Sequence, residues 1–110
     1  MEDKERQRYI LFKIISEGKI EDKQLIRAIW KNLFQLYGDF GTSQTGLWVI
    51  EYENNHGIIR TNVQALQMVR TALAVIRKIE DKNCLFVVIG VSGTIKALKK
   101  KHLSKLNSGA

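Results

Sequence analysis

Apolar positions along the chain change between strand-like and helix-like spacing, and this predicts the order of its elements. Residues 8–16 are rich in aromatic and β-branched side chains and are apolar on both faces, which is typical of a central strand. Residues 84–91 have the same two-sided character and predict a second central strand. Two shorter strands, 47–53 and 58–61, flank the turn sequence of residues 54–57 and predict a hairpin. In the first of these, we expect Trp48, Ile50 and Tyr52 to share one face.

Residues 21–37 have helical spacing, with Glu21 and Asp22 at the start and Gly38 placed to end the helix. The apolar face is wider than one contact with a sheet needs, so the helix is either wedged between elements or meets another protein, with burial inside the chain as the default. Its two apolar stripes are Leu25, Ile29, Leu33, Leu36 and Ile26, Trp30, Phe34, Tyr37.

A second helix is predicted over residues 62–79, capped either by Thr61 with Gln64 or by Asn62. Its buried face consists of Leu66, Val69, Leu73 and Ile76. A third helix follows Ser92-Gly93-Thr94 and continues to about residue 106, with Ser92 or Thr94 as its cap.

The order strand, helix, strand, strand, helix, strand predicts an α+β fold, a ferredoxin-like or RRM-like two-layer sandwich (β-α-β-β-α-β) with an extra basic C-terminal helix. We expect the first and last strands in the middle of the sheet, and the last helix over part of the open face or over an edge. The whole chain, 1–110, is predicted to be a single domain with an ordered core of about 8–106.

Charge is distributed unevenly around the net value of +7. Residues 1–55 carry eight Lys or Arg against nine Asp or Glu, whereas residues 56–110 carry ten against two. This asymmetry favours an anionic partner, with nucleic acid ahead of membrane, although a lysine-coated surface that confers solubility is an equal reading of the charge alone. We see no apolar segment for secretion or for crossing a bilayer and expect a cytoplasmic protein.

The sequence contains no recognisable catalytic or metal-binding constellation. Cys84 lies in an apolar run and is predicted to be a core residue, and His56 and His102 have no carboxylate or cysteine partners at metal-binding spacing. Ser92 has no base nearby in sequence, and Asp39-Phe40-Gly41 is predicted to be a structural turn.

Two groups of side chains are candidates for binding. Basic residues after the Ser-Gly-Thr turn suit phosphate, because a helix start adds backbone donors to the positive charge. The candidates for RNA contact are Lys96, Lys99, Lys100, Lys101, Lys105, Thr94, Arg60 and Arg70. A second set could contact another protein, although burial in the core is the default for these residues. They are Trp48, Tyr52, Tyr9, Leu11, Trp30 and Phe34.

Five motifs resemble a known family in their order and spacing. They are residues 8–12 (RYILF), 36–41 (LYGDFG), 57–62 (GIIRTN), 69–73 (VRTAL) and 91–96 (VSGTIK). Together they make residues 8–101 similar to the Pop-five family, the small α/β protein subunits of archaeal and eukaryotic nuclear ribonuclease P, and the short chain resembles archaeal members more than eukaryotic ones.

The resemblance implies a non-catalytic subunit of the enzyme that removes 5′ leaders from precursor tRNA. The RNA subunit would perform hydrolysis with magnesium ions, and the protein itself would bind no cofactor. The implied partners are the ribonuclease P RNA, precursor tRNA, a TIM-barrel-like subunit of the Rpp-thirty type, and a second copy of the chain that would join two such pairs. A protein-assembly module or a small-molecule sensor without RNA binding is the alternative.

Overall fold

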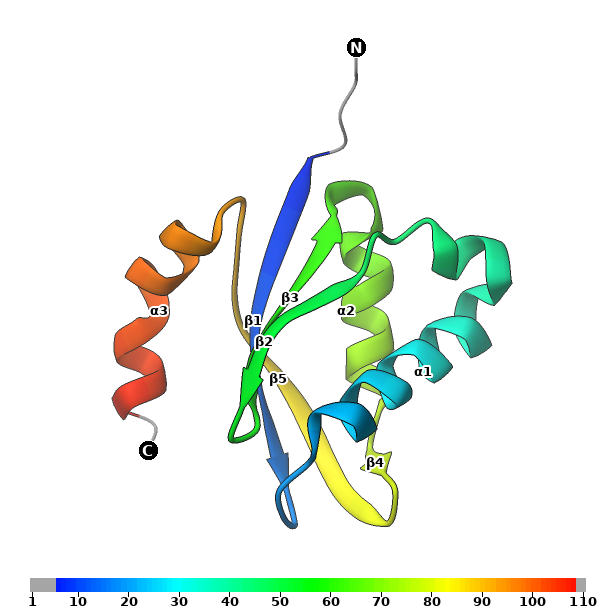
Figure 1. Ribbon diagram of the computed structural model, residues 1–110, viewed down its shortest axis with the longest axis horizontal. Coiled ribbons are helices and arrows are strands. Elements are labelled where there is room, and N and C mark those ends of the chain that lie inside the picture. Colours follow the sequence, from blue (N-terminus) through cyan, green and yellow to red (C-terminus); the bar gives the residue numbers. More distant parts are fainter. Residues whose placement is uncertain (1–5, 109–110) are drawn as a thin grey trace.

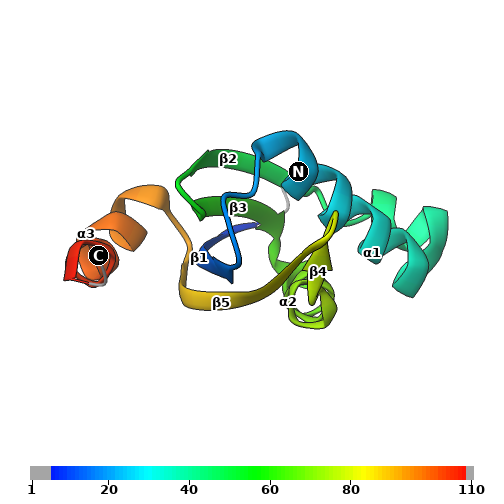
Figure 2. The same cartoon turned by 90° about the horizontal axis from the view of Figure 1, so that it is seen from below.

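The computed structural model describes the backbone of residues 6–108 and the side chains of residues 6–101. Within this range, a five-stranded antiparallel sheet has α1 and α2 on one face and α3 on the other (Figures 1 and 2). The elements in chain order are β1 (Gln7–Ser16), α1 (Asp22–Ser43), β2 (Trp48–Glu53), β3 (His56–Asn62), a 3-10 turn (Val63–Ala65), α2 (Leu66–Val75), β4 (Lys78–Ile79), β5 (Lys82–Ser92) and α3 (Ile95–Ser108).

The sheet has the strand order β2-β3-β1-β5-β4, so the prediction that β1 and β5 lie inside it is confirmed. Strand β1 is buried on both faces, which explains its two-sided apolar sequence. Ile10, Phe12 and Ile14 belong to the main core with α1 and α2, whereas Leu11 belongs to a second cluster beneath α3. Each face of β1 therefore requires a helical layer.

Helix α1 differs from its predicted extent. Gly38 has φ 74° and ψ −177°, so it interrupts the helical backbone as a capping glycine would. After Gly38 the backbone is helical again, and the helix ends at Ser43. The prediction that the helix gives way to a turn and loop directly after Gly38 is therefore wrong. The prediction of Leu36 in the core is also wrong, since its side chain is 45% exposed.

The β2–β3 hairpin is confirmed and turns tightly at Asn54 and Asn55, which have φ values of 53° and 63°. The Asn55 side chain also ties the hairpin to the β1–α1 connection. Its Oδ1 accepts a hydrogen bond from the Ile20 N–H at 3.0 Å, and its amide donates to the Gly18 carbonyl at 3.3 Å.

The second helix is shorter than predicted. Asn62 caps the 3-10 turn that leads into α2, since Asn62 Oδ1 accepts from the Ala65 N–H, whereas the Thr61 hydroxyl donates to the Thr45 carbonyl. The helix ends at Val75, and the predicted continuation to residue 79 is wrong. Residues Lys78 and Ile79 instead pair with β5, whose backbone supplies hydrogen bonds in place of helical ones.

Strand β2 contains a bulge that changes which face its side chains occupy. Register shifts between Val49 and Glu51, so Ile50 is an extra residue opposite β3. Ile50 therefore packs in the cluster beneath α3, while Tyr52 stacks on Phe12 in the main core with ring centroids 6.2 Å apart. The prediction that Trp48, Ile50 and Tyr52 share one face is wrong for this reason.

We expect Tyr52 to make folding stability sensitive to alkaline pH. Burial, together with the nearby charges of Glu21 and Asp22, raises the pKa of Tyr52 to about 12, whereas the pKa of an unfolded tyrosine is about 10. Between these values the unfolded chain releases a proton that the folded chain retains, so the free energy of unfolding falls as pH rises. Below about pH 10 this contribution to stability is fully present.

Tyr52→Phe provides the comparison. The variant loses the hydrogen bond that the Tyr52 hydroxyl donates to the Ile20 carbonyl at 2.7 Å, which should cost about 1 kcal/mol at neutral pH. Urea unfolding from pH 7 to 12 should show the stability advantage of the parent protein shrinking above pH 10. A pH-independent difference between the two proteins would contradict the assignment.

Candidate nucleic-acid interface

Helix α3 is held on the sheet by Leu98. This side chain is fully buried in a cluster with Leu11 and Ile58, and Tyr9 and Ile95 pack around it partly buried. The helix start is also fixed, because Thr94 Oγ1 accepts a hydrogen bond from the Ala97 N–H at 3.1 Å. Thr94 is thus the cap of α3, and the basic residues that follow project from a docked helix.

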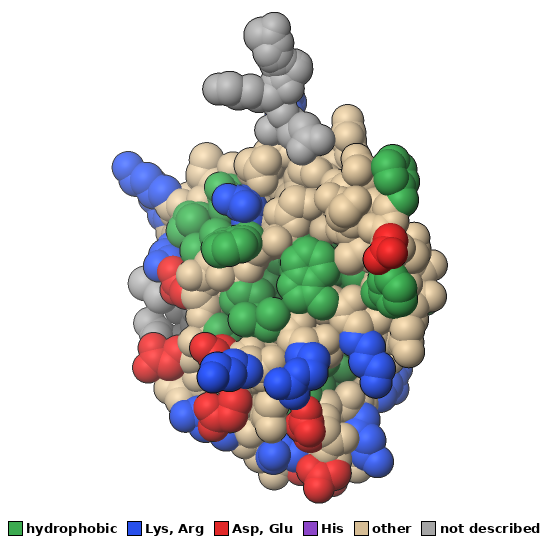
Figure 3. Space-filling view, turned by 45° about the vertical axis from the view of Figure 1, so that its right-hand side comes forward, with side chains coloured by type: hydrophobic (Ala, Val, Ile, Leu, Met, Phe, Trp, Pro, Cys, Tyr) green, Lys and Arg blue, Asp and Glu red, His purple; other side chains and the backbone are tan. Residues whose placement is uncertain are grey.

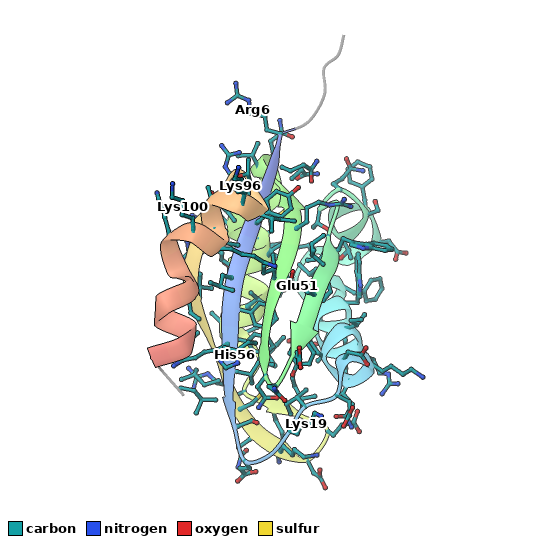
Figure 4. The ribbon with its side chains drawn as sticks, turned by 60° about the vertical axis from the view of Figure 1, so that its left-hand side comes forward. Arg6, Lys19, Glu51, His56, Lys96 and Lys100 are labelled. Carbon is teal, nitrogen blue, oxygen red and sulfur yellow. The ribbon has the colours of Figure 1, made fainter. Side chains whose placement is uncertain are left out.

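Basic side chains gather at the start of α3. Figure 4 shows Arg6, Lys96 and Lys100 at the same end of the molecule and Lys19 at the opposite end. The pairing of Tyr9 with Ser92 brings the first residues of β1 beside the turn that precedes α3. We call Arg6, Arg8, Lys96 and Lys100 the α3 basic end.

Arg8 and Arg60 extend this charge over the end of the sheet. A Cβ built on Gly93 would lie 3.7 Å from Arg8 Nη1, so Arg8 reaches the turn before α3. Arg60 lies opposite Tyr9, and its Nε is buried without a hydrogen-bond partner among the described residues. Arg6 and Arg8 are not among the residues predicted from the sequence, because only strand pairing shows that residues 6–8 lie beside residues 92–94.

The remaining candidates for RNA contact have different environments. Lys99 Nζ forms an ion pair with Glu51 Oε2 at 2.8 Å, which turns this lysine towards β2. Lys101 is exposed, whereas the side chains of Lys105 and His102 lie outside the described residues. Arg70 is exposed on α2, in the layer on the other face of the sheet, so the structure does not bring it near the lysines of α3.

Three of the candidates for protein contact lie on one surface. Trp30 and Phe34 of α1 and Trp48 of β2 are accompanied by Ile26, and Phe34 and Trp48 are 52% and 61% exposed. A hollow of about 220 Å³ lies among Ile26, Trp30, Leu47, Trp48 and Val49. Apolar side chains are prominent on the corresponding side of the molecule (Figure 3). We call Ile26, Trp30, Phe34 and Trp48 the α1 apolar patch.

The other three candidates are largely internal. Leu11 is buried beneath α3, Tyr9 is partly buried beside it, and Tyr52 packs in the main core. Their environments agree with the core alternative considered for the sequence. Protein contact at these positions stays a prediction.

Metal-binding clusters and the thiol of Cys84 are the features relevant to protein-borne chemistry in the described part of the chain. No group of three His, Cys, Asp or Glu side chains among them lies close enough to hold a metal ion. Cys84 is buried in the main core, and burial raises the pKa of its thiol, which disfavours the reactive thiolate. In the described part of the chain, no helix has both the length and the apolar run that a membrane crossing requires.

The structure defines a small α+β sandwich with a cationic helix docked on its sheet, and the comparisons with known proteins specify the family. Residues 8–103 match the model of the Rpp14/Pop5 family, and the chain belongs to this family. Similar proteins named ribonuclease P protein component 2 occur in several archaea.

The relative from Pyrococcus horikoshii is 35% identical over 104 residues, covering 93% of this chain and 87% of that protein. The relative from Archaeoglobus fulgidus is 37% identical over 99 residues, covering 89% of both chains. The fold is similar to a chain in a cryo-EM structure of yeast ribonuclease MRP, with a TM-score of 0.69, 12% identity, and coverage of 99% of this chain and 97% of that one.

We expect Leu98→Ala to release α3 from the sheet. Removing this fully buried side chain should cost about 2–5 kcal/mol, and the loss should fall mainly on α3 because Leu98 is the most buried of the α3 side chains that the structure describes. Hydrogen exchange should then accelerate in α3 while β1 stays protected. Leu36→Ala, at a 45% exposed position, is the control and should change stability by about 0.5 kcal/mol or less. Unchanged protection of α3 in Leu98→Ala would contradict this role.

Proposed function

We propose that this chain is a non-catalytic protein subunit of ribonuclease P, which binds and supports the catalytic RNA that removes 5′ leaders from precursor tRNA. The observation that carries the proposal is the α3 basic end, in which two lysines of a docked helix lie beside two arginines at the start of β1, in a chain of the Rpp14/Pop5 family. The archaeal relatives named ribonuclease P protein component 2 support it.

The α3 basic end suits the RNA backbone more than RNA bases. Lys96 and Lys100 are one helical turn apart and exposed, and Arg6 and Arg8 lie beside them. Cations of this kind neutralise phosphates, whereas reading unpaired bases requires stacking on aromatic side chains. Phe12 and Phe86 of the central strands stack in the main core and are unavailable for this purpose. The exposed Phe34 and Trp48 belong to the α1 apolar patch and not to the α3 basic end, so we infer that the RNA contact at the α3 basic end is sequence-independent.

The proposal assigns bond cleavage and magnesium ions to the RNA subunit. This chain contributes positive charge at a fixed place, which offsets the repulsion between phosphates that a compact RNA brings together. Precursor tRNA is the substrate of the whole particle in this proposal.

The α1 apolar patch is the surface we assign to a protein partner, a TIM-barrel-like subunit of the Rpp-thirty type. Exposed tryptophan and phenylalanine are typical of protein interfaces, and here Ile26, Trp30 and Trp48 of the patch line a hollow of about 220 Å³. A second copy of this chain, which would join two such pairs, is a further proposed partner. We also propose that the long strands form a ferredoxin-like sheet, since their order β2-β3-β1-β5 and antiparallel pairing support it.

A protein-assembly module without RNA binding is the second candidate, and the α1 apolar patch is the observation that favours it. Gel filtration with and without RNA separates the two. An oligomer that ignores RNA would favour assembly alone. A monomer that ignores RNA would favour a sensor, for which the hollow of about 290 Å³ between α3 and the β2–β3 hairpin is the available site.

Reconstitution tests the proposed function directly. The RNA is assembled with its partner proteins, with and without this chain, and cleavage of precursor tRNA is measured. We expect cleavage to fall when the chain is left out, and the chain alone to cleave nothing. Equal cleavage in both assemblies would overturn the proposal.

The α3 basic end should determine part of the salt dependence of RNA binding. For the double variant Lys96→Ala/Lys100→Ala, we expect the slope of log affinity against log salt to fall by about 1.5, since each lost phosphate contact removes about 0.7–0.9. Lys99→Ala should have a smaller effect, because Lys99 is already paired with Glu51.

The matched control is Lys19→Ala/Lys23→Ala, which removes the same charge, with Lys19 at the opposite end of the molecule (Figure 4). Both variants are titrated with RNA at several salt concentrations. Equal slopes for the two variants would remove the α3 basic end from the interface.

A further inference from the structure

A polar hollow lies on the side of the sheet away from α3, between α1 and the β4–β5 hairpin. It has a volume of about 450 Å³, and no site described above uses it. Its lining is Gln24, Arg27, Ala28, Lys31, Asn32 and Gln35 from α1, and Lys78, Ile79 and Glu80 from β4 and the turn after it. We call this hollow the α1–β4 groove.

The two walls of the groove are fixed by the fold. Gln24, Arg27, Lys31 and Gln35 recur at helical spacing and form one polar stripe along α1. Opposite this stripe, Ile79 is buried and anchors β4, and Glu80 turns the chain with φ 57°. Arg27 Nη1 meets Glu80 Oε2 at 3.3 Å, which joins the two walls at one point.

The charge of the groove is positive after its acids are accounted for. Glu80 is paired with Arg27, whereas Lys31 and Lys78 form no ion pair among the described residues. The nearby carboxylate of Glu17, which interacts electrostatically with Lys78, accepts hydrogen bonds from the backbone and side chain of Asn83 at 2.8 and 3.1 Å, and these bonds lower its pKa. Glu17 therefore stays ionised beside Lys78, with Asp81 in the same neighbourhood, so Lys78 is partly offset. The lining itself still carries three cations against one carboxylate, which favours an anionic ligand.

The remaining lining indicates which anion fits. Gln35 adds an amide to the lining, while apolar side chains contribute little. Gln24 and Asn32 add Nε2 and Oδ1, because Gln24 Oε1 accepts from the Glu21 N–H and Asn32 Nδ2 donates to the Ala28 carbonyl. Lysine for phosphate, with amides for ribose hydroxyls, is the combination that proteins use along an RNA backbone. Protein interfaces, in contrast, are depleted in lysine and enriched in aromatic residues, as in the α1 apolar patch.

We propose that the α1–β4 groove is a second RNA-backbone site, which holds a segment of RNA different from the one at the α3 basic end. The inference rests on the proposed function, because it takes the partner to be RNA. The two sites lie on opposite faces of the sheet (Figures 1 and 2), so one local stretch of backbone cannot fill both. The protein thereby bridges two parts of the folded RNA.

The test compares three double variants in the reconstituted particle. They are Lys31→Ala/Lys78→Ala in the groove, Lys96→Ala/Lys100→Ala in α3, and the control Lys19→Ala/Lys23→Ala. Lys23 lies on α1 but does not line the groove, so the control separates the site from general charge. Hydroxyl-radical footprinting maps the protected RNA segments, and salt titration measures the slope.

We expect the groove variant to lose protection of one RNA segment and the α3 variant to lose protection of another, with each slope reduced by about one to two. The control should retain both segments. Lys31→Glu/Lys78→Glu should show a larger loss at the same RNA segment, and thermal melting verifies that each variant folds.

Four outcomes would overturn the groove proposal. They are an unchanged footprint in the groove variant, loss of the same segment in both variants, loss of protein partners with unchanged RNA protection, and binding of inorganic phosphate or a mononucleotide at the groove without any effect on RNA. If the α3 variant also leaves RNA binding unchanged, the proposed function itself fails. If only the groove variant leaves RNA protection unchanged, the proposal of a second RNA site fails and the proposed function stands.

Discussion

The contact of Leu98 with Leu11 and Ile58 fixes α3 on the sheet and so determines where the basic residues of α3 lie. Strand β1 lies inside the sheet with apolar side chains on both faces, so a sheet covered on one face only would leave Leu11 in water. Helix α3 covers that face, and its position follows from this burial. Because the helix is docked, Lys96 and Lys100 stay at the same end of the molecule as Arg6 and Arg8.

Different kinds of side chain lie on different surfaces of this small sandwich. Cations project from the outer layer formed by α3, and exposed aromatic side chains lie on α1 and the edge strand β2. A third surface, the α1–β4 groove, combines lysine with amides. A subunit that holds RNA and protein together requires separate surfaces of this kind, because cations that bind phosphate weaken an apolar interface, and aromatic residues do little for phosphate.

Sequence patterns predicted much of the fold because they reflect local rules. The two-sided apolar runs identified both central strands, and the Asn54-Asn55 turn identified the hairpin. The predictions that are wrong concern features that pairing decides. The bulge in β2 separates Ile50 from Tyr52, and pairing with β5 converts the expected end of the second helix into β4. The spacing of apolar residues within one segment does not show which distant segment will pair with it.

The sequence by itself determined the elements, the charge asymmetry and the family motifs, since these depend on residue order alone. Only the tertiary structure decided which charges act together. Strand pairing brought Arg6 and Arg8 to the start of α3, an ion pair with Glu51 turned Lys99 towards the sheet, and layering left Arg70 on the other face. Electrostatic interaction depends on distance in space, and distance in space is set by how the sheet pairs and what covers it.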